Sequence, residues 1–156
     1  MKLAFYTEED LPLLSYELDD IQVRYTATPE QALQRIKDKN STDAYAVTIF
    51  YNEKAVGFFV LDFGEDKLDL TENPDSVLLR SLSVNPKFQG KGLGKFAMLE
   101  VVGFIRKHFK NCNEIVLAVN QKNDSAYHLY LKTGYVFNGK TRIGRNGVQY
   151  LMCKEL

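Results

Sequence analysis

A strand-like run that ends in a glycine-rich turn and continues into a long apolar helix most constrains how this chain can fold. The run Ser76–Val84 is rich in β-forming residues, and apolar residues recur at helical spacing from Leu93 to about His108. Between them lie three glycines within five residues, Gly90, Gly92 and Gly94. Exposed backbone N–H groups at a helix N-terminus bind anions, so this turn predicts a site for a phosphate or pyrophosphate.

Two common phosphate-binding motifs fail at particular residues of the turn. A P-loop requires GxxxxGK followed by Ser or Thr, whereas Gln89 stands in place of its first glycine and Phe96 in place of its hydroxyl residue. The dinucleotide pattern GxGxxG requires a glycine where this chain has Lys95. Lys91 and Lys95 add positive charge, which favours contact with a phosphate over the alternative of two solvated side chains.

The other segments alternate between strand-like and helix-like patterns without a repeat or a linker, which predicts one domain over residues 1–156. Strands are expected over residues 2–7, 44–51, 55–63, 76–84, 114–119, 135–137 and 148–153, with a turn region at 139–147. Helices are expected over residues 8–15, 28–39, 93–108 and 125–132, and Thr28 with Gln31 forms a capping box for the second of them. The order β-α-α-β-β-β-α-β-α-β-β predicts an α/β fold (α+β layered) with a mixed sheet.

The few cysteines and histidines exclude several classes of protein. Cys112 and Cys153 give no disulfide framework, and with His108 and His128 they are too few for a zinc cluster. Free thiols fit a reducing compartment, so a cytoplasmic protein is expected. No stretch resembles a signal peptide or approaches the roughly 18 apolar residues of a membrane span, so no membrane partner is expected.

Charge is divided unevenly along the chain. Residues 1–79 hold 7 Lys+Arg and 16 Asp+Glu, for a net charge of −9, whereas residues 80–156 hold 13 and 4, for +9. This asymmetry suggests that one half faces an anion and the other a cation, although solvated charged faces would give the same count. The basic residues do not form a stripe with interleaved aromatic residues, so no nucleic-acid partner is expected.

Two stretches resemble the GNAT superfamily of N-acetyltransferases. Residues 89–94, QGKGLG, fit its Q/R-x-x-G-x-G/A signature, and NxxAxxLYxxxGY from Asn123 to Tyr135 resembles its second conserved stretch. The two occur in the order and spacing of the family, and the expected elements around them fit as well. Within the superfamily, QGKGLGK at 89–95, FNGK at 137–140 and the final MCKEL are similar to bacterial spermine/spermidine (polyamine) acetyltransferases.

The resemblance implies a mostly antiparallel central sheet with helices on both faces, acetyl-CoA as co-substrate and no metal. It implies that the CoA pyrophosphate is held by backbone N–H groups of the turn, from Gln89, Gly90, Lys91, Gly92, Leu93, Gly94 and Lys95. It also implies that the preceding strand pairs with the pantetheine arm through Leu82, Ser83 and Val84. The N–H of Leu82 or of the next residue then polarises the acetyl carbonyl, as an oxyanion hole does.

The resemblance further assigns roles to two side chains of the second stretch. Asn123 would contact the pantetheine, and Tyr130 would act as the general acid that protonates the departing thiolate. Each also has a structural interpretation, since Tyr130 could be a core tyrosine and Asn123 could cap its helix. His128 is expected to be an ordinary surface residue, and neither cysteine has a neighbouring base that would make it a nucleophile.

The general base is not identified by the sequence. Many family members place a carboxylate on the strand before the turn, but residues 77–84 contain no acid and carry Arg80 instead. Arg80 is expected to form a structural ion pair. Asp62, Asp69 and Glu72 are candidates for the base only because they are expected near the acceptor.

The sequence therefore predicts an acetyl-CoA-dependent N-acetyltransferase that acetylates a primary amine by direct attack in a ternary complex. The expected acceptor is a small cationic amine such as a polyamine, attracted by acidic residues of the N-terminal half. These residues are Glu17, Asp19, Asp20, Glu72 and Asp75. The alternatives are a peptide or protein N-acetyltransferase and a catalytically inactive CoA-binding module, and a homodimer is left open.

Overall fold

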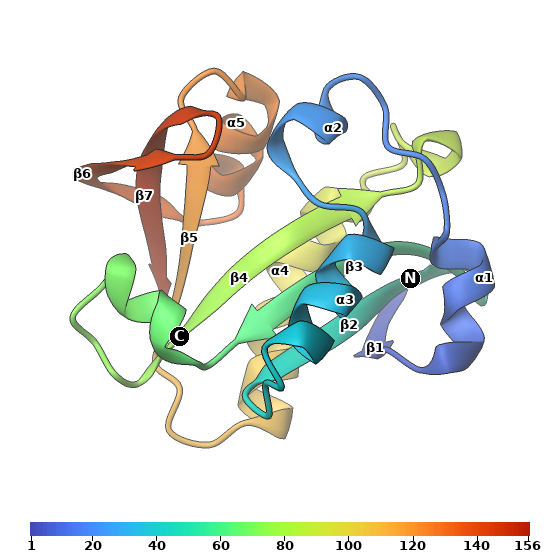
Figure 1. The fold of residues 1–156 in the computed structure, drawn as a ribbon, viewed down its shortest axis with the longest axis horizontal. Helices are drawn as coiled ribbons and strands as arrows, with labels where there is room; N and C mark the ends of the chain where they lie inside the picture. The colour runs from blue at the N-terminus through green and yellow to red at the C-terminus, as the bar shows by residue number, and fades with distance from the viewer.

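A seven-stranded sheet in the order β1-β2-β3-β4-β5-β7-β6 organises the computed structural model, which describes all 156 residues (Figure 1). Its strands are β1 (Lys2–Phe5), β2 (Ala44–Tyr51), β3 (Lys54–Asp62), β4 (Ser76–Val84), β5 (Glu114–Asn120), β6 (Val136–Gly144) and β7 (Gly147–Glu155). The helices are α1 (Leu11–Leu14), α2 (Gln22–Tyr25), α3 (Pro29–Asp38), α4 (Leu93–His108) and α5 (Asp124–Lys132). Short 3-10 turns occupy Glu8–Asp10, Glu65–Asp69 and Pro86–Phe88.

The central pair of strands, β4 and β5, is the only parallel pair, and every other neighbouring pair is antiparallel. This confirms the expected mixed, mostly antiparallel sheet. The parallel pairing covers only Ser76–Leu78 of β4 against Glu114–Val116 of β5. Beyond these residues the two strands diverge, as Figure 1 shows, so the sheet is continuous at one end and split at the other.

A β-bulge lies on β4 just beyond the point of divergence. Ser81 has φ +59°, and the pairing with β3 shifts register between Phe58 and Val60. An extra residue in one strand bends it and re-aims its backbone groups. The bulge therefore alters the direction of the cleft-facing edge of β4 in the middle of the sheet.

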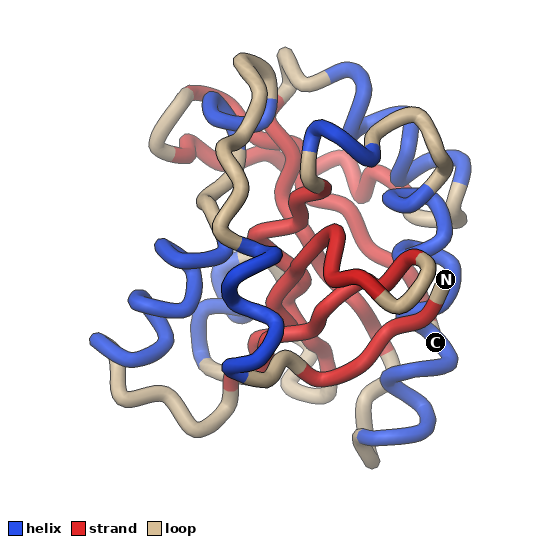
Figure 2. Tube along the Cα trace, turned by 90° about the vertical axis from the view of Figure 1, so that its right-hand side faces the viewer, coloured by secondary structure: helices blue, strands red, loops and turns tan.

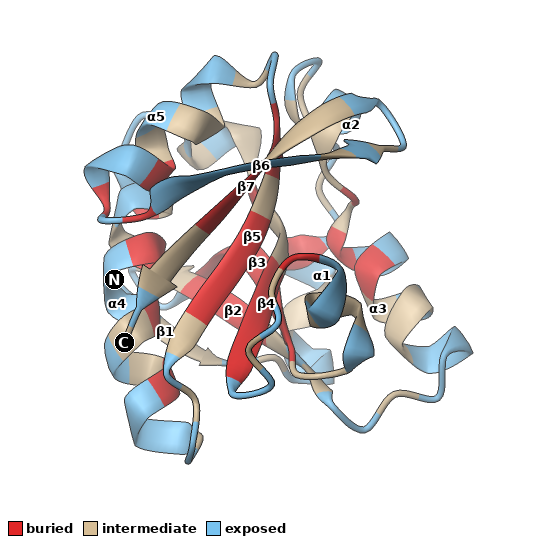
Figure 3. Ribbon diagram, turned by 90° about the vertical axis from the view of Figure 1, so that its left-hand side faces the viewer, coloured by how far each residue is buried: buried red, intermediate tan, exposed pale blue.

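Helices cover both faces of the sheet, as expected (Figure 2). On one face the apolar side of α4 packs on Val56, Phe59 and Leu61 of β3 in a large core that also receives Tyr130 from α5. On the other face, a smaller core joins Leu14 of α1 and Ala32 of α3 to the alternate residues of β3. The two faces of β3 thus serve two cores, and its alternation is shifted by one residue at the irregularity between Ala55 and Gly57. Burial is concentrated in the central strands, whereas β6 at the sheet edge is largely exposed (Figure 3).

Hydrogen bonds confirm the capping box that predicted α3. Thr28 Oγ1 accepts the N–H of Gln31 at 3.1 Å, and Gln31 Oε1 accepts the N–H of Thr28 at 3.0 Å, which is the expected capping box at α3. Gly134 follows α5 with φ +92°, a conformation that favours glycine. None of the helices is both long and apolar enough to cross a lipid bilayer.

Three segments differ from the sequence-based expectations. The helix expected over residues 8–15 is a 3-10 turn followed by the short α1, and the helix α2 was not predicted. The expected turn region at 139–147 is mostly strand, because β6 continues to Gly144 and only Arg145 and Asn146 form the turn. β6 is an exposed edge strand, and its pairing with β7 shifts register between Phe137 and Thr141. Its many polar residues therefore give it the composition of a loop.

Candidate active site

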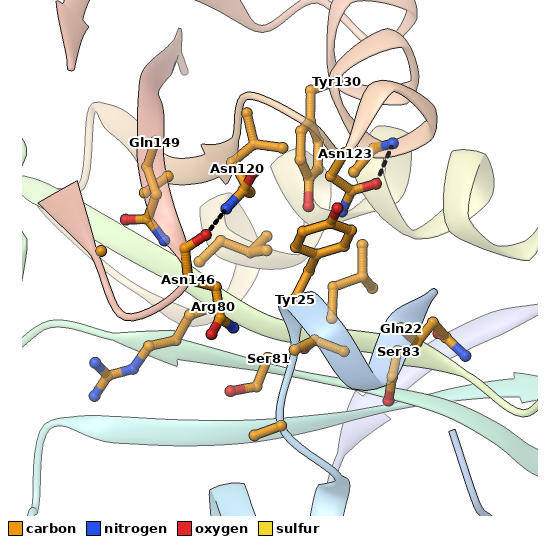
Figure 4. A pocket seen from close by; sticks show the side chains of 18 of the residues that line it. Gln22, Tyr25, Arg80, Ser81, Ser83, Asn120, Asn123, Tyr130, Asn146 and Gln149 are labelled. Carbon is orange, nitrogen blue, oxygen red and sulfur yellow. Dashed lines mark hydrogen bonds between the residues drawn. The ribbon is translucent and has the colours of Figure 1, made fainter. Parts of the chain in front are cut away.

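A cavity of about 670 Å³ lies between the diverging parts of β4 and β5. Its volume is in the range of small-molecule binding sites. Residues 78–84 of β4 and 118–120 of β5 line it, and further side chains come from α2, α3, α5 and the ends of β6 and β7. Figure 4 shows these side chains converging on the space from both halves of the sheet.

One end of the cavity adjoins the glycine-rich turn. Gly90 and Gly92 have φ +78° and +76°, and a Cβ at either position would meet no atom within 4 Å. Backbone conformation rather than lack of space therefore requires glycine at both positions. Gly92 caps the 16-residue helix α4, whose first N–H groups have no partner within the helix. The turn thus fits an anion such as a pyrophosphate.

The turn is brought close to the second conserved stretch by helix packing. A Cβ at Gly94 would lie 3.3 Å from Cδ2 of Leu129, so α4 approaches α5 closely at this glycine. Gln89 and Gly94 line the cavity, whereas Lys91 and Lys95 are exposed beside it, and Lys91 Nζ lies 5.8 Å from the centre of the Tyr51 ring. Leu93 contributes its backbone to the turn while its side chain is buried in the core.

The cleft-facing edge of β4 is partly occupied by a side chain from α2. Gln22 Oε1 accepts the N–H of Val84 at 3.0 Å, and Gln22 Nε2 donates to the carbonyl of Val84 at 3.1 Å. The carboxamide thereby pairs with β4 as a neighbouring strand would. Val84 is one of the residues expected to pair with the pantetheine arm, and no pattern in the sequence predicted that Gln22 would lie there.

The other two residues expected to pair with the pantetheine differ in their surroundings. Ser83 is buried, and its Oγ shares a hydrogen bond of 2.7 Å with the hydroxyl of Tyr16. Leu82 is half-buried, lines the cavity and directly follows the bulge at Ser81. The side chain of Ser83 is therefore engaged inside the fold.

Tyr130 lies at the cavity from within α5, almost completely buried. Burial raises the pKa of its hydroxyl to about 12, so the group keeps its proton at neutral pH. Asn123 Oδ1 accepts the N–H of Ala126 at 3.3 Å and caps the helix, which leaves its Nδ2 donor without a partner in the chain. Tyr25 of the unpredicted helix α2 lines the cavity from the opposite side (Figure 4).

Arg80 forms the structural ion pair expected of it. Its guanidinium pairs with Asp62, which is buried, and with Asp66 at 3.1 Å, while Asp66 also pairs with Lys39 at 2.9 Å. The hydrogen bond from Lys39 is the largest cause that lowers the pKa of the Asp66 carboxyl. Of the three base candidates, only Asp69 lines the cavity, whereas Asp62 and Glu72 do not.

The acidic residues expected to attract a cation do not gather at the cavity. Asp19 alone lines it, and Asp19 Oδ1 accepts the N–H groups of Ile21 at 3.0 Å and Gln22 at 2.7 Å. Guanidinium groups line the cavity instead, from Arg35, Arg80, Arg142 and Arg145. Both histidines and both cysteines lie outside the lining.

The family comparison matches residues 11–135 to the Acetyltransferase (GNAT) family. The match includes the glycine-rich turn and the second stretch up to Tyr135. It also includes β4, on which the split of the sheet depends.

Two curated proteins from Bacillus subtilis (strain 168) are similar to the chain over nearly its whole length. One, named Uncharacterized N-acetyltransferase YbbJ, is 38% identical over 97% of this chain and 95% of its own. The other, Spermine/spermidine N(1)-acetyltransferase, is 26% identical over 92% of this chain and 90% of its own.

Among solved structures, the spermidine N-acetyltransferase from Vibrio cholerae in complex with CoA and spermine has a TM-score of 0.70. It is 18% identical, and the match covers 99% of this chain and 94% of that one. At this identity the match shows that the two share a fold.

Proposed function

The chain belongs to the Acetyltransferase (GNAT) family and is an acetyl-CoA-dependent N-acetyltransferase, and from this premise we propose that it acetylates the primary amine of a small molecule. The observation that carries the proposal is the position of Tyr130, a buried and protonated hydroxyl at the cleft between β4 and β5. A proton donor there suits the release of a thiolate. It also weighs against the alternative of an inactive CoA-binding module.

Acetyl-CoA would be held by the two elements that border the cleft on the side of α4. Backbone N–H groups from Gln89 to Lys95 would bind its pyrophosphate, helped by the dipole of α4. The backbone of Leu82, Ser83 and Val84 would pair with the extended pantetheine arm, for which Gln22 must release Val84. Asn123 Nδ2 is free to donate to the same arm.

The chemistry proposed is direct attack of a neutral amine on the thioester carbonyl. The new bond joins the amine nitrogen to the acetyl carbon, and the bond from that carbon to sulfur breaks. The N–H of Leu82, beside the bulge, would stabilise the developing negative charge on the carbonyl oxygen. Tyr130 would donate its proton to the departing sulfur, and the proton of the amine would leave to water or to Asp69.

The curated relatives favour a polyamine as the acceptor, since one of them is a spermine/spermidine N(1)-acetyltransferase. The charge of the cleft does not add support, because the predicted carboxylates other than Asp19 lie outside its lining. A peptide acceptor remains the second candidate from the sequence. The acceptor is therefore proposed here only as a small primary amine.

Release of free thiol from acetyl-CoA, measured across polyamines, amino acids and short peptides, tests the proposal. Thiol release that depends on a small amine, with formation of the acetylated amine seen by mass spectrometry, is the expected result. Calorimetry with CoA should show binding in the low-micromolar to sub-millimolar range. CoA binding without transfer to any amine would instead favour the inactive binding module.

A further inference from the structure

The charges at the end of the cavity remote from the glycine turn do not balance. Figure 4 shows Arg80, Asn146 and Gln149 at this end, with Gln22 and Ser83 at the other. The charged side chains that line the whole cavity are Asp19, Asp66, Asp69, Arg35, Arg80, Arg142 and Arg145. Those already paired with an opposite charge must be set aside before the charge offered to a ligand is known.

One carboxylate and one guanidinium of the lining are already held in ion pairs, and a second carboxylate accepts hydrogen bonds from neutral groups. Asp19 accepts two backbone N–H groups, and Asp66 and Arg80 pair with each other and with Lys39 and Asp62. The three ion pairs of the protein all lie in this last cluster. No carboxylate oxygen therefore lies within 4.0 Å of the guanidinium groups of Arg35, Arg142 or Arg145. Against these three cations the lining holds two carboxylates outside the ion pairs: Asp69, which is exposed, and Asp19, which keeps its charge because its donors are the neutral N–H groups of Ile21 and Gln22.

Arg142 is the best positioned of the three. It faces Gln149 across the β6–β7 pair, and its Nε donates to Gln149 Oε1 at 2.7 Å. Gly144 makes room for this contact, because a Cβ there would lie only 2.5 Å from Cδ of Gln149. With Nε engaged by a neutral partner, the two terminal nitrogens of the guanidinium remain available. That pair suits the two oxygens of a carboxylate.

The turn that follows Arg142 is fixed across the cavity. The carbonyl of Asn146 accepts Nδ2 of Asn120 on β5 at 2.9 Å, and the side chain of Asn146 donates to the carbonyl of Arg24 on α2. The turn is thereby tied to both walls of the cleft. Arg142 and Arg145 consequently border the cavity from a segment held at two points.

We propose that the amine acceptor also carries a carboxylate, which Arg142 binds while the amine faces the acetyl group. The proposal rests on the proposed function and specifies its substrate class as small zwitterionic amines. A polyamine offers no group to these guanidiniums, and its additional ammonium groups would be repelled by them at this end of the cleft. Arg35 and Arg145 add to the positive potential that draws the carboxylate in.

Matched acceptors of equal length test the proposal directly. For chains of three to six carbons, the ω-aminocarboxylate, the alkylamine and the diamine are compared by kcat/KM, together with α-amino acids and their carboxamides. At least one carboxylate-bearing amine should exceed both of its matched partners by about 10-fold or more. Preference for the diamines or for spermidine would overturn this inference and leave the acetyltransferase proposal intact. Absence of transfer to every amine would overturn both.

Variants of Arg142 separate recognition from a general effect on the fold. Arg142→Gln should raise the KM for the carboxylate-bearing acceptor about 10- to 100-fold, the range of a lost hydrogen-bonded charge, with kcat and CoA affinity retained. KM for its neutral carboxamide should not change. Arg142→Lys keeps the charge but lacks the planar guanidinium, so its KM for the carboxylate-bearing acceptor should lie between those of the unmodified protein and Arg142→Gln. Arg106→Gln, an exposed change on α4, is the control, and an equal KM rise for acid and carboxamide would contradict the proposal.

Discussion

The two ends of the cleft are built in different ways. The end next to α4 is made by the backbone of one continuous segment, Gln89–Lys95, at the start of a long helix. The opposite end is made by side chains from α2, α3, β4, β6 and β7, which lie far apart in the sequence. On the proposed function, the backbone groups of the continuous turn would bind the cofactor, and the remote side chains would bind the acceptor. The first end therefore depends on a local backbone conformation, and the second depends on how distant segments of this chain pack together.

The largest effect is expected from a change that destroys the backbone-built end. Gly92→Asp should weaken CoA binding by at least about 100-fold, because it forces a side chain into φ +76° and puts a negative charge at the helix N-terminus. Calorimetry with CoA measures the effect. Gly103→Ala in the same helix, where a Cβ meets no atom within 4 Å, is the control and should bind normally. Retained affinity in Gly92→Asp would show that the pyrophosphate binds elsewhere.

Tyr130→Phe tests the chemistry between the two ends. It should lower kcat by roughly 10- to 1000-fold, as expected for a lost general acid, with CoA affinity nearly unchanged. Because the pKa of Tyr130 is raised to about 12, the hydroxyl stays protonated through neutral and mildly alkaline pH, and its ionisation should cause no fall in rate between pH 7 and 10. Tyr127→Phe in the same helix serves as the control. Normal turnover in Tyr130→Phe would mean that water protonates the thiolate.

Gln22 lies at the end of the cleft next to the glycine turn although it comes from α2, and it occupies the edge of β4 that the cofactor arm needs. Gln22→Ala should strengthen CoA binding about 2- to 10-fold, because two hydrogen bonds to Val84 no longer have to be broken. Titration with CoA measures the change, and Gln34→Ala on the surface of α3 is the control. Weaker binding would reveal that Gln22 moves onto the cofactor and holds it.

The smallest effect is expected at the second tyrosine of the conserved stretch. The hydroxyl of Tyr135 is buried without a hydrogen-bond partner, so removing it should leave stability unchanged or raise it by up to about 1 kcal/mol. Urea unfolding of Tyr135→Phe measures this, with thiol release as the second readout. Turnover should match that of the unmodified protein, in contrast to Tyr130→Phe five residues earlier. A marked loss of stability would mean that the hydroxyl has a partner after all.

The difference between the two ends also explains what the sequence could and could not predict. The glycine turn, the helix α4 and the capping box at Thr28 depend on neighbours in the chain, so local patterns predicted them, and the family resemblance extended this to the sheet. The positions of Gln22, Tyr25 and Arg142 depend on how distant segments pack, and no spacing in the sequence records that. The acidic excess of residues 1–79 did not predict which carboxylates line the cleft. The reason is the same, because net charge does not say which side chains face a cavity.

The short pairing between β4 and β5 has a consequence for the exchange of amide hydrogens with solvent. Amides in the middle of a sheet usually exchange slowest, because they are bonded on strands that seldom open. Here the pairing ends at Leu78, and from Leu79 onward the cleft side of β4 has no strand beside it. Among these amides Val84 is held by the side chain of Gln22. The centre of this sheet should therefore exchange like an outer strand until an extended ligand takes the missing place.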